Sequence, residues 1–139
     1  MARRRPVRRG DISLDKWTNW LKNLRNASSN KMIVCQHKKA YDVLKALGCK
    51  NVTYVTEPEY DFIQKLIDFG KECLLLFDTD RNSNVKCQKL RSKLEHRGVK
   101  VSTRFRKMFF TSQSKSVSGI LKYIHRVIGS ERVHRSAPV

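Results

Sequence analysis

Two aspartates separated by one residue follow the most apolar stretch of the chain. The stretch covers residues 73–77, and Asp78 and Asp80 come directly after it. In an open α/β sheet, ligands bind outside the carboxyl ends of the strands, so a strand at 73–77 would deliver both carboxylates to that edge. Two carboxylates there can share a hard cation such as Mg²⁺, which would neutralise a phosphodiester and position an attacking water. Aspartates also end strands as ordinary turn residues, and the pair alone leaves both interpretations open.

The residues around this pair alternate between short apolar runs and helical patterns. The apolar runs predict strands at 32–35, 51–55, 73–77 and 99–102. Apolar residues at helical spacing predict helices at 38–47, 58–69, 85–96 and 117–128, which end at Gly48, Gly70, Gly98 and Gly129. This order predicts an α/β fold, a compact Rossmann-like domain with about four mainly parallel strands between helices. An extra N-terminal helix, capped by Ser13 or Asp11, carries Trp17 and Trp20, and we expect these rings to pack on the sheet.

The net charge of +18 is concentrated in the two ends of the chain. Residues 1–31 carry nine basic and two acidic side chains, residues 32–80 carry six and eight, and residues 81–139 carry fifteen and two. Such a charge predicts a polyanionic partner, because neutralising it releases counterions. Nucleic acid is the first candidate, an anionic membrane would require a basic amphipathic helix, and a basic protein without such a partner is the remaining alternative. No apolar run approaches the ~18 residues that span a bilayer, which predicts that no segment crosses a membrane.

Composition divides the chain into a basic arm at 1–12, an α/β domain with its N-terminal helix at 13–129, and a C-terminal tail at 130–139. The arm has too few apolar residues to pack by itself, so we expect it to order on a partner. Its arginines suit bidentate phosphate contacts and are the first candidates for them: Arg3, Arg4, Arg5, Arg8 and Arg9.

Two further basic segments lie within the domain, one on the helix predicted after Asp80 and one at 103–113. Their cationic side chains are predicted to contact nucleic acid: Lys86, Lys89, Arg104, Arg106 and Lys107. The second segment also contains three phenylalanines. Cations beside aromatic rings can combine phosphate contacts with base stacking, but the rings could instead cover the edge of the sheet.

The chain has four cysteines, at positions 35, 49, 73 and 87. No two of them form a C-x-x-C pair, and their spacing relative to the histidines does not match a zinc site. The first residues lack the apolar stretch of about 7–15 residues that marks a secretory signal. We therefore expect reduced thiols in an intracellular, cytoplasmic protein.

Three segments of the chain resemble the Toprim family. They are residues 32–48, the Leu-Leu-Leu-Phe-Asp-Thr-Asp-Arg stretch at 74–81, and Arg-Gly-Val-Lys-Val at 97–101 after a basic helix. The Toprim domain is a small Rossmann-like fold shared by topoisomerases, bacterial-type primases and the ribonuclease that matures 5S ribosomal RNA. The similarity covers about residues 32–127 and is greatest to small, stand-alone Toprim proteins of archaea.

The resemblance implies roles for two motifs. In the family the first strand is followed by a glutamate, a glycine and usually a lysine, and these positions fall on Gln36, His37 and Lys38. The glutamate moves protons or binds metal in the family, and the D-x-D pair, kept here as Asp78 and Asp80, holds Mg²⁺. Gln36 can neither carry a negative charge nor shuttle a proton at neutral pH, whereas His37 could take over proton transfer. The resemblance therefore implies a Toprim catalytic set whose affinity for Mg²⁺ is weakened by Gln36.

Two functions remain open at this point. The first is a binding module that docks on structured RNA, with ribosomal RNA and the ribosome as candidate partners, and with a degenerate catalytic site. The second is a Mg²⁺-dependent enzyme that cleaves or transfers phosphodiesters. We favour the first, because an enzyme needs a replacement for its proton-transfer carboxylate. RNA is preferred to DNA, because short arginine-rich arms commonly fold onto structured RNA.

Overall fold

The computed structural model describes residues 13–112 and 116–136, with side chains through residue 127. The arm predicted at 1–12 lies outside the described residues. The five arginines predicted to contact phosphates lie outside them for the same reason: Arg3, Arg4, Arg5, Arg8 and Arg9. Residues 137–139 of the predicted tail also fall outside the description.

Four parallel strands form one sheet in the order β2-β1-β3-β4. The strands are β1 (Met32–Cys35), β2 (Val52–Tyr54), β3 (Cys73–Leu76) and β4 (Val101–Ser102). β1 and β3 pair along their whole length, whereas β4 pairs only with Cys73 and Leu74. The predicted α/β class and the Rossmann-like architecture are confirmed, and all four strands are parallel rather than most of them.

Helices connect the strands and flank the sheet within the described ranges. They are α1 (Leu14–Ala27), α2 (Lys38–Ala46), α3 (Glu59–Phe69), α4 (Arg81–His96), the 3-10 turn η1 (Arg104–Arg106), α5 (Lys107–Thr111) and α6 (Val117–Ser136). α1 begins where the Ser13 hydroxyl accepts a hydrogen bond from the Lys16 amide at 3.3 Å. α3 ends at Gly70, whose φ of 72° is the left-handed conformation that glycine adopts without strain.

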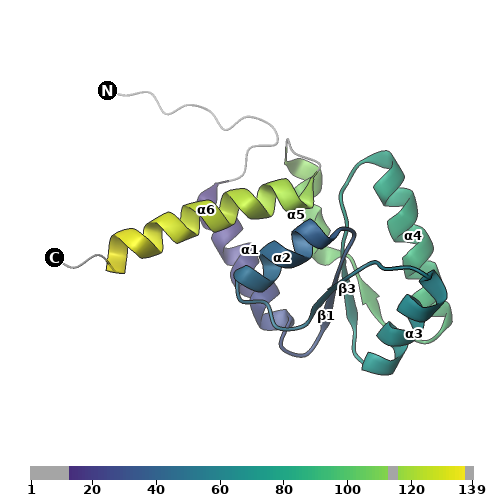
Figure 1. Ribbon diagram of the computed structural model, residues 1–139. Helices are drawn as coiled ribbons and strands as arrows, with labels where there is room; N and C mark the ends of the chain where they lie inside the picture. The colour runs from purple at the N-terminus through teal and green to yellow at the C-terminus, as the bar shows by residue number, and fades with distance from the viewer. Residues whose placement is uncertain (1–12, 113–115, 137–139) are drawn as a thin grey trace.

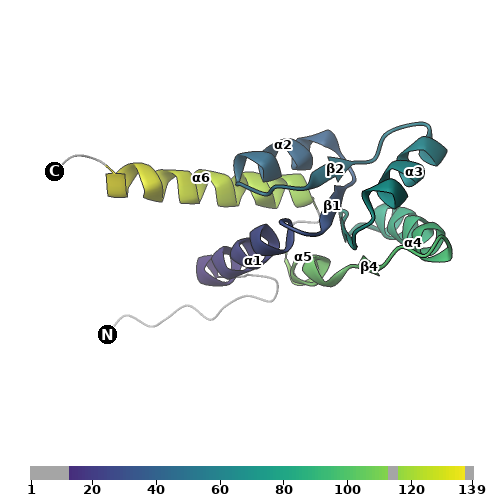
Figure 2. The same ribbon diagram turned by 90° about the horizontal axis from the view of Figure 1, so that it is seen from below.

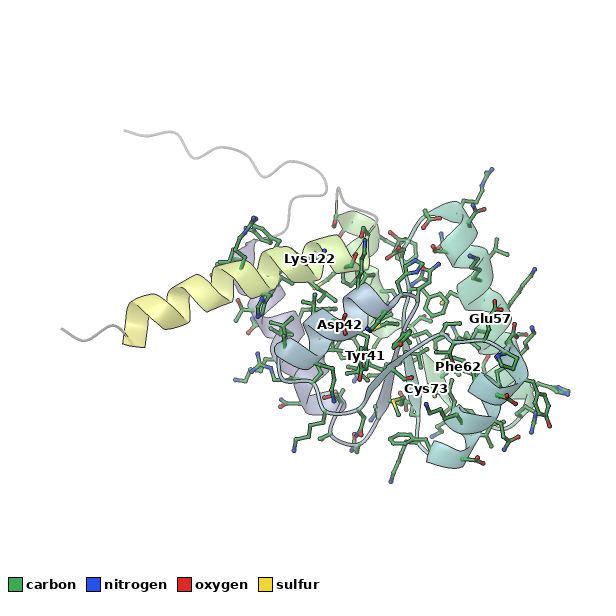
Figure 3. The ribbon with its side chains drawn as sticks, viewed as in Figure 1. Tyr41, Asp42, Glu57, Phe62, Cys73 and Lys122 are labelled. Carbon is green, nitrogen blue, oxygen red and sulfur yellow. The ribbon has the colours of Figure 1, made fainter. Side chains whose placement is uncertain are left out.

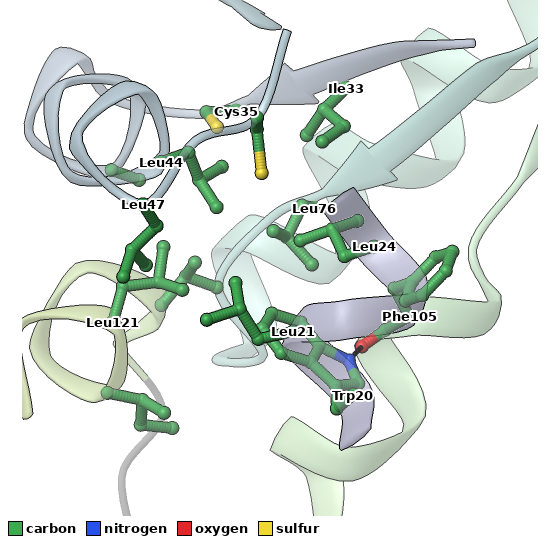
Figure 4. Packing of buried hydrophobic residues seen from close by; sticks show 14 of the residues in the cluster. Trp20, Leu21, Leu24, Ile33, Cys35, Leu44, Leu47, Leu76, Phe105 and Leu121 are labelled. Carbon is green, nitrogen blue, oxygen red and sulfur yellow. Dashed lines mark hydrogen bonds between the residues drawn. The ribbon is translucent and has the colours of Figure 1, made fainter. Parts of the chain in front are cut away.

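The helices cover both faces of the sheet (Figures 1 and 2). On one face α1, α2 and α6 bury Ile33, Cys35 and Leu76, and Trp20 packs into the same cluster as predicted (Figure 4). On the other face α3 and α4 enclose a second cluster, in which Phe62 points from α3 toward the sheet (Figure 3). Alternate residues of β1 and β3 therefore face different clusters, which explains why these strands are apolar throughout.

Two boundaries differ from the prediction by more than two residues. α4 begins at Arg81 rather than at residue 85, and this register leaves Val85 49% exposed while Cys87 lies in the core. The last helix is also longer than predicted, because α6 passes through Gly129 and ends at Ser136. One glycine costs a helix only about 1 kcal/mol relative to alanine, so it does not end a helix unless the backbone turns into the left-handed region there.

None of the helices in the described ranges is long and apolar enough to cross a membrane.

Candidate functional site

The parallel pairing of β1 and β3 brings the two predicted motifs together at the carboxyl edge of the sheet. Cys35 and Leu76, the last residues of these strands, are directly paired. Gln36 and His37 therefore leave β1 beside the point where Asp78 leaves β3. This juxtaposition is the one that the sequence motifs require, and we call the region the carboxyl edge.

Gln36 joins the two strand ends through its side chain. Its Oε1 atom accepts a hydrogen bond from the backbone amide of Asp78 at 3.2 Å. A glutamate at this position would place a negative charge beside the Asp78 carboxylate, whereas the neutral amide does not. Gln36 thus links the ends of β1 and β3 by a hydrogen bond, and it adds no titratable group to the carboxyl edge.

The Asp78 carboxylate connects three parts of the chain. Its Oδ1 atom accepts a hydrogen bond from the Val117 amide at 2.8 Å, and its Oδ2 atom lies 3.8 Å from Nε2 of His37. Val117 is the first residue of α6, so the carboxylate also lies at the positive end of a helix dipole. The Asp78 side chain is 20% exposed and that of His37 is 59% exposed, which leaves the histidine open to a ligand.

Asp80 caps α4. One of its oxygens accepts from the Ser83 amide at 3.2 Å and the other from the Ser83 hydroxyl at 2.5 Å. These two hydrogen bonds hold the pKa of Asp80 below its ordinary value, because they stabilise the charged carboxylate. Residues 82–84, which precede the predicted helix, therefore belong to its first turn. An aspartate followed three residues later by a serine was the signal in the sequence for this cap.

The donor set at the carboxyl edge fits a resident Mg²⁺ ion poorly, because most of its oxygens already accept hydrogen bonds. Mg²⁺ requires oxygen ligands in near-octahedral geometry. Both oxygens of Asp80 accept from Ser83, one oxygen of Asp78 accepts from Val117, and the Gln36 oxygen accepts from Asp78. Within the described part of the chain, no group of three or more histidine, cysteine, aspartate or glutamate side chains could hold a metal ion.

Arg106 is an internal residue, and the prediction that it contacts nucleic acid is wrong. It is 6% exposed. Its Nε atom donates to the carbonyl oxygen of Phe77 at 3.0 Å, and its Nη2 atom donates to the Asp78 carbonyl at 2.5 Å and to Oδ1 of Asn84 at 2.6 Å. Because β4 pairs only with the first two residues of β3, the carbonyls after β3 have no strand partner on that side. The guanidinium supplies the missing donors.

The other predicted cations of the domain are exposed. Lys86 and Lys89 of α4 line a cavity of about 300 Å³ at the carboxyl edge together with Gln36 and His37. Lys93, one helical turn further along, reaches the same cavity and forms an ion pair with Glu59. The cavity is thus bordered by α4 cations on one side and by the end of β1 on the other, and Glu57 and Glu59 complete its lining.

The remaining predicted residues are exposed but do not line this cavity. Lys38 is exposed at the start of α2, and Lys107 is exposed at the start of α5. Arg104 is also exposed, and its guanidinium carbon lies 4.7 Å from the centroid of the Phe105 ring.

The phenylalanines of the basic segment divide between the two roles considered for them. Phe105 and Phe109 are buried in the cluster under α1, where they cover the sheet. Phe110 is 46% exposed, and the Arg106 guanidinium lies 5.0 Å from its ring centroid. Of the three rings, Phe110 is therefore the one that a base could stack on.

The four cysteines are buried thiols. Burial raises the pKa of Cys49 and of Cys73 to about 11 and raises the pKa of Cys35 further. The thiolate is the reactive form of cysteine, so these groups are unsuited to nucleophilic chemistry at neutral pH. They act as small core residues.

Comparison with known proteins gives two likenesses. No protein-family model matches the chain. A UPF0292 protein of Methanocaldococcus jannaschii is 24% identical over 124 residues, which cover 85% of this chain and 97% of that protein. A solved structure of a protein from Aquifex aeolicus matches with a TM-score of 0.67 and 24% identity, over 73% of this chain and 95% of that one. At this identity the structural likeness shows the fold, a compact α/β domain built on a parallel sheet, and it carries no assignment of activity.

Proposed function

We propose that the chain is a Toprim-fold protein that binds structured RNA at the carboxyl edge of its sheet and along α4, with a catalytic site that has become a binding surface. One observation carries this proposal. The edge keeps exposed cations, Lys86 and Lys89, while Gln36, Asp78 and Asp80 accept hydrogen bonds from the protein itself. Such a surface can hold a phosphate backbone without acting on it.

The charge of the chain supports nucleic acid as the partner. Residues 81–139 carry fifteen basic side chains and only two acidic ones. A protein that neutralises several phosphates gains affinity by releasing counterions, and this gain is lost as salt is added. RNA fits better than DNA because an arginine-rich arm of twelve residues precedes the domain in the sequence. A highly structured RNA such as ribosomal RNA offers the phosphate density that this surface needs.

A second candidate function is Mg²⁺-dependent cleavage of phosphodiesters. The observation that favours it is the distance of 3.8 Å between Nε2 of His37 and the Asp78 carboxylate, since a histidine held beside a carboxylate is an arrangement that general acid–base catalysis uses. The donor set described above argues against this candidate, because Gln36 supplies no charge and the aspartates are engaged within the protein.

The test of the proposal is a salt titration of RNA binding with two charge-matched double variants. Lys86→Gln/Lys89→Gln removes two cations from the carboxyl edge. Lys71→Gln/Lys100→Gln removes two exposed cations that precede β3 and β4, at the opposite edge of the sheet. We expect the first variant to reduce the slope of log K against log salt by about two, and the second to leave it nearly unchanged.

Two outcomes would contradict the proposal. One is equal slopes for both variants, which would mean that general charge rather than the carboxyl edge attracts RNA. The other is an absence of RNA binding by the unmodified chain at physiological salt. Incubating a structured RNA with Mg²⁺ and with the unmodified chain or its Asp78→Asn variant tests the enzyme, because cleavage that is lost in the variant would favour the second candidate.

A further inference from the structure

A second and larger concavity lies away from the carboxyl edge. It has a volume of about 800 Å³ and runs between α1 and the η1–α5 segment, which lie side by side in Figure 2. We call it the α1 groove. Its two walls are tied together, because the indole nitrogen of Trp20 donates to the Phe105 carbonyl at 2.9 Å in the buried interior. The groove is therefore a preformed feature of the fold.

One wall of the groove is a row of asparagines. Asn19, Asn23 and Asn26 are spaced four and three residues apart, which places them on one face of α1, and Asn30 follows just after the helix. All four are exposed, and their side-chain amides form no hydrogen bond with any part of the chain that the structure describes. Asparagine is a poorer helix former than the lysine, glutamate or glutamine usual on a solvated face, so helix stability does not explain the row.

The groove is also positively charged. Lys16 lies near one end of the asparagine row and Lys31 near the other, while Arg104 faces them from η1. None of the described residues that line the groove is acidic. From Lys16 to Ala27 the helix rises about 17 Å, so the cations frame an elongated strip of free amides.

We propose that the α1 groove binds an unpaired stretch of RNA, with the asparagine amides on base edges and with Lys16, Lys31 and Arg104 on phosphates. This inference rests on the proposed RNA-binding function and names the part of the RNA that a second site takes. An amide offers both a donor and an acceptor, the combination that the edges of unpaired bases require. An acidic peptide would need cations in place of the amides, and paired bases would hide the edges that the amides could reach.

The test compares two variants of α1 in the full chain. Asn19→Ala/Asn23→Ala removes two amides, and alanine at these positions favours the helix. Thr18→Ala is the control, because Thr18 is exposed on the same helix, does not line the groove and bonds its own helix through the Leu14 carbonyl. The ligands are a short single-stranded RNA of mixed sequence, a strand of equal length that lacks its bases, and an RNA duplex, and binding is followed by fluorescence anisotropy.

We expect the double variant to bind the single-stranded RNA at least about tenfold more weakly than the unmodified chain, with the same salt slope. It should bind the baseless strand and the duplex as tightly as the unmodified chain does, and Thr18→Ala should match the unmodified chain on all three. Equal binding of the single strand by the double variant and the unmodified chain would overturn the inference. A tenfold loss on the baseless strand would also overturn it, because the amides would then not be reading bases.

Failure of this inference is distinguishable from failure of the proposed function. If Lys86→Gln/Lys89→Gln weakens RNA binding while Asn19→Ala/Asn23→Ala does not, the carboxyl edge binds RNA and the α1 groove does not. If the unmodified chain binds none of the three ligands, both proposals are wrong. If a poly-glutamate peptide displaces the single strand from the unmodified chain but not from the double variant, the groove is a peptide site.

Discussion

The guanidinium of Arg106 donates to the carbonyl oxygen of Phe77 at 3.0 Å, across 29 positions of sequence. This contact replaces a strand hydrogen bond that the two-residue β4 is too short to provide. It fixes the end of β3, from which the aspartates of the carboxyl edge follow. A buried arginine surrounded by carbonyl and amide oxygens is thus part of the structure that positions this edge.

Replacing Arg106 by lysine should destabilise the protein. A single ammonium group cannot satisfy the three oxygens that the planar guanidinium reaches, and each buried acceptor left without a donor costs about 1–3 kcal/mol. We expect Arg106→Lys to lower the free energy of unfolding by about 2–3 kcal/mol in urea titrations. Arg104→Lys, an exposed change in the same 3-10 turn, should stay within about 0.5 kcal/mol of the unmodified protein. Equal midpoints for the two variants would show that the buried contacts contribute little.

Replacing Gln36 by glutamate should create a response to Mg²⁺. The new carboxylate would lie beside that of Asp78, and their repulsion should lower stability by about 1 kcal/mol without a divalent cation. We expect Mg²⁺ to restore the melting temperature of Gln36→Glu and to leave that of the unmodified protein unchanged. Gln88→Glu adds the same charge at an exposed position of α4 and serves as the control. A Mg²⁺-induced rise of equal size in all three proteins would count against a special geometry at the carboxyl edge.

Asp80 should make stability depend on pH in the acid range. Its pKa is depressed in the folded state, so its stabilising contribution is fully present above the ordinary value of 3.8 and is lost as the pH falls from there through the folded value. We expect Asp80→Ala to lower the urea midpoint at pH 7, and the difference from the unmodified protein to shrink below about pH 4. Asp80→Asn keeps an accepting oxygen that does not titrate. The difference in urea midpoint between Asp80→Asn and Asp80→Ala should therefore not vary with pH. If the difference in urea midpoint between the unmodified protein and Asp80→Ala did not depend on pH, the role of ionised Asp80 as the cap of α4 would be contradicted.

The four thiols should react slowly in the folded protein. Burial raises the pKa of Cys49 and Cys73 to about 11, so few thiolates exist at pH 8, and all four side chains are shielded from reagent. We expect a chromogenic disulfide reagent to label the folded protein slowly and to label four thiols at once in denaturant. Val85→Cys places a thiol at an exposed position of α4 and should add one fast reaction. Rapid labelling of the unmodified folded protein would mean that the core opens readily.

Local signals in the sequence predicted the framework of the molecule well. The apolar run at 73–77 contains β3, because both faces of this strand are buried and polar side chains there would lose their contact with water. Gly70 ends α3 because it can adopt a positive φ. These outcomes depend on a few neighbouring residues, and the sequence presents those neighbours directly. The Toprim resemblance, by contrast, stays a prediction.

The sequence analysis failed where a residue's role depends on distant parts of the chain. Arg106 looked like its neighbours Arg104 and Lys107, and its burial follows from the shortness of β4, which no local pattern reveals. The Val117 amide was not considered as a partner of Asp78, since the two residues are 39 positions apart. The start of α4 was different, because Asp80 and Ser83 form a local cap, whereas the helix was predicted to begin only at residue 85.

The hydrogen bond from Val117 to Asp78 closes a loop in the chain that begins at β3 and returns at the first residue of α6. The segment between these two residues contains α4, β4 and η1, and the hydrogen bond joins its two ends. Shortening the protein from its C-terminus to a point before Val117 would undo it. Removing α6 would expose the apolar side of α2 to solvent and would leave the Asp78 carboxylate without its Val117 donor. The last helix therefore stabilises both the core and the carboxyl edge.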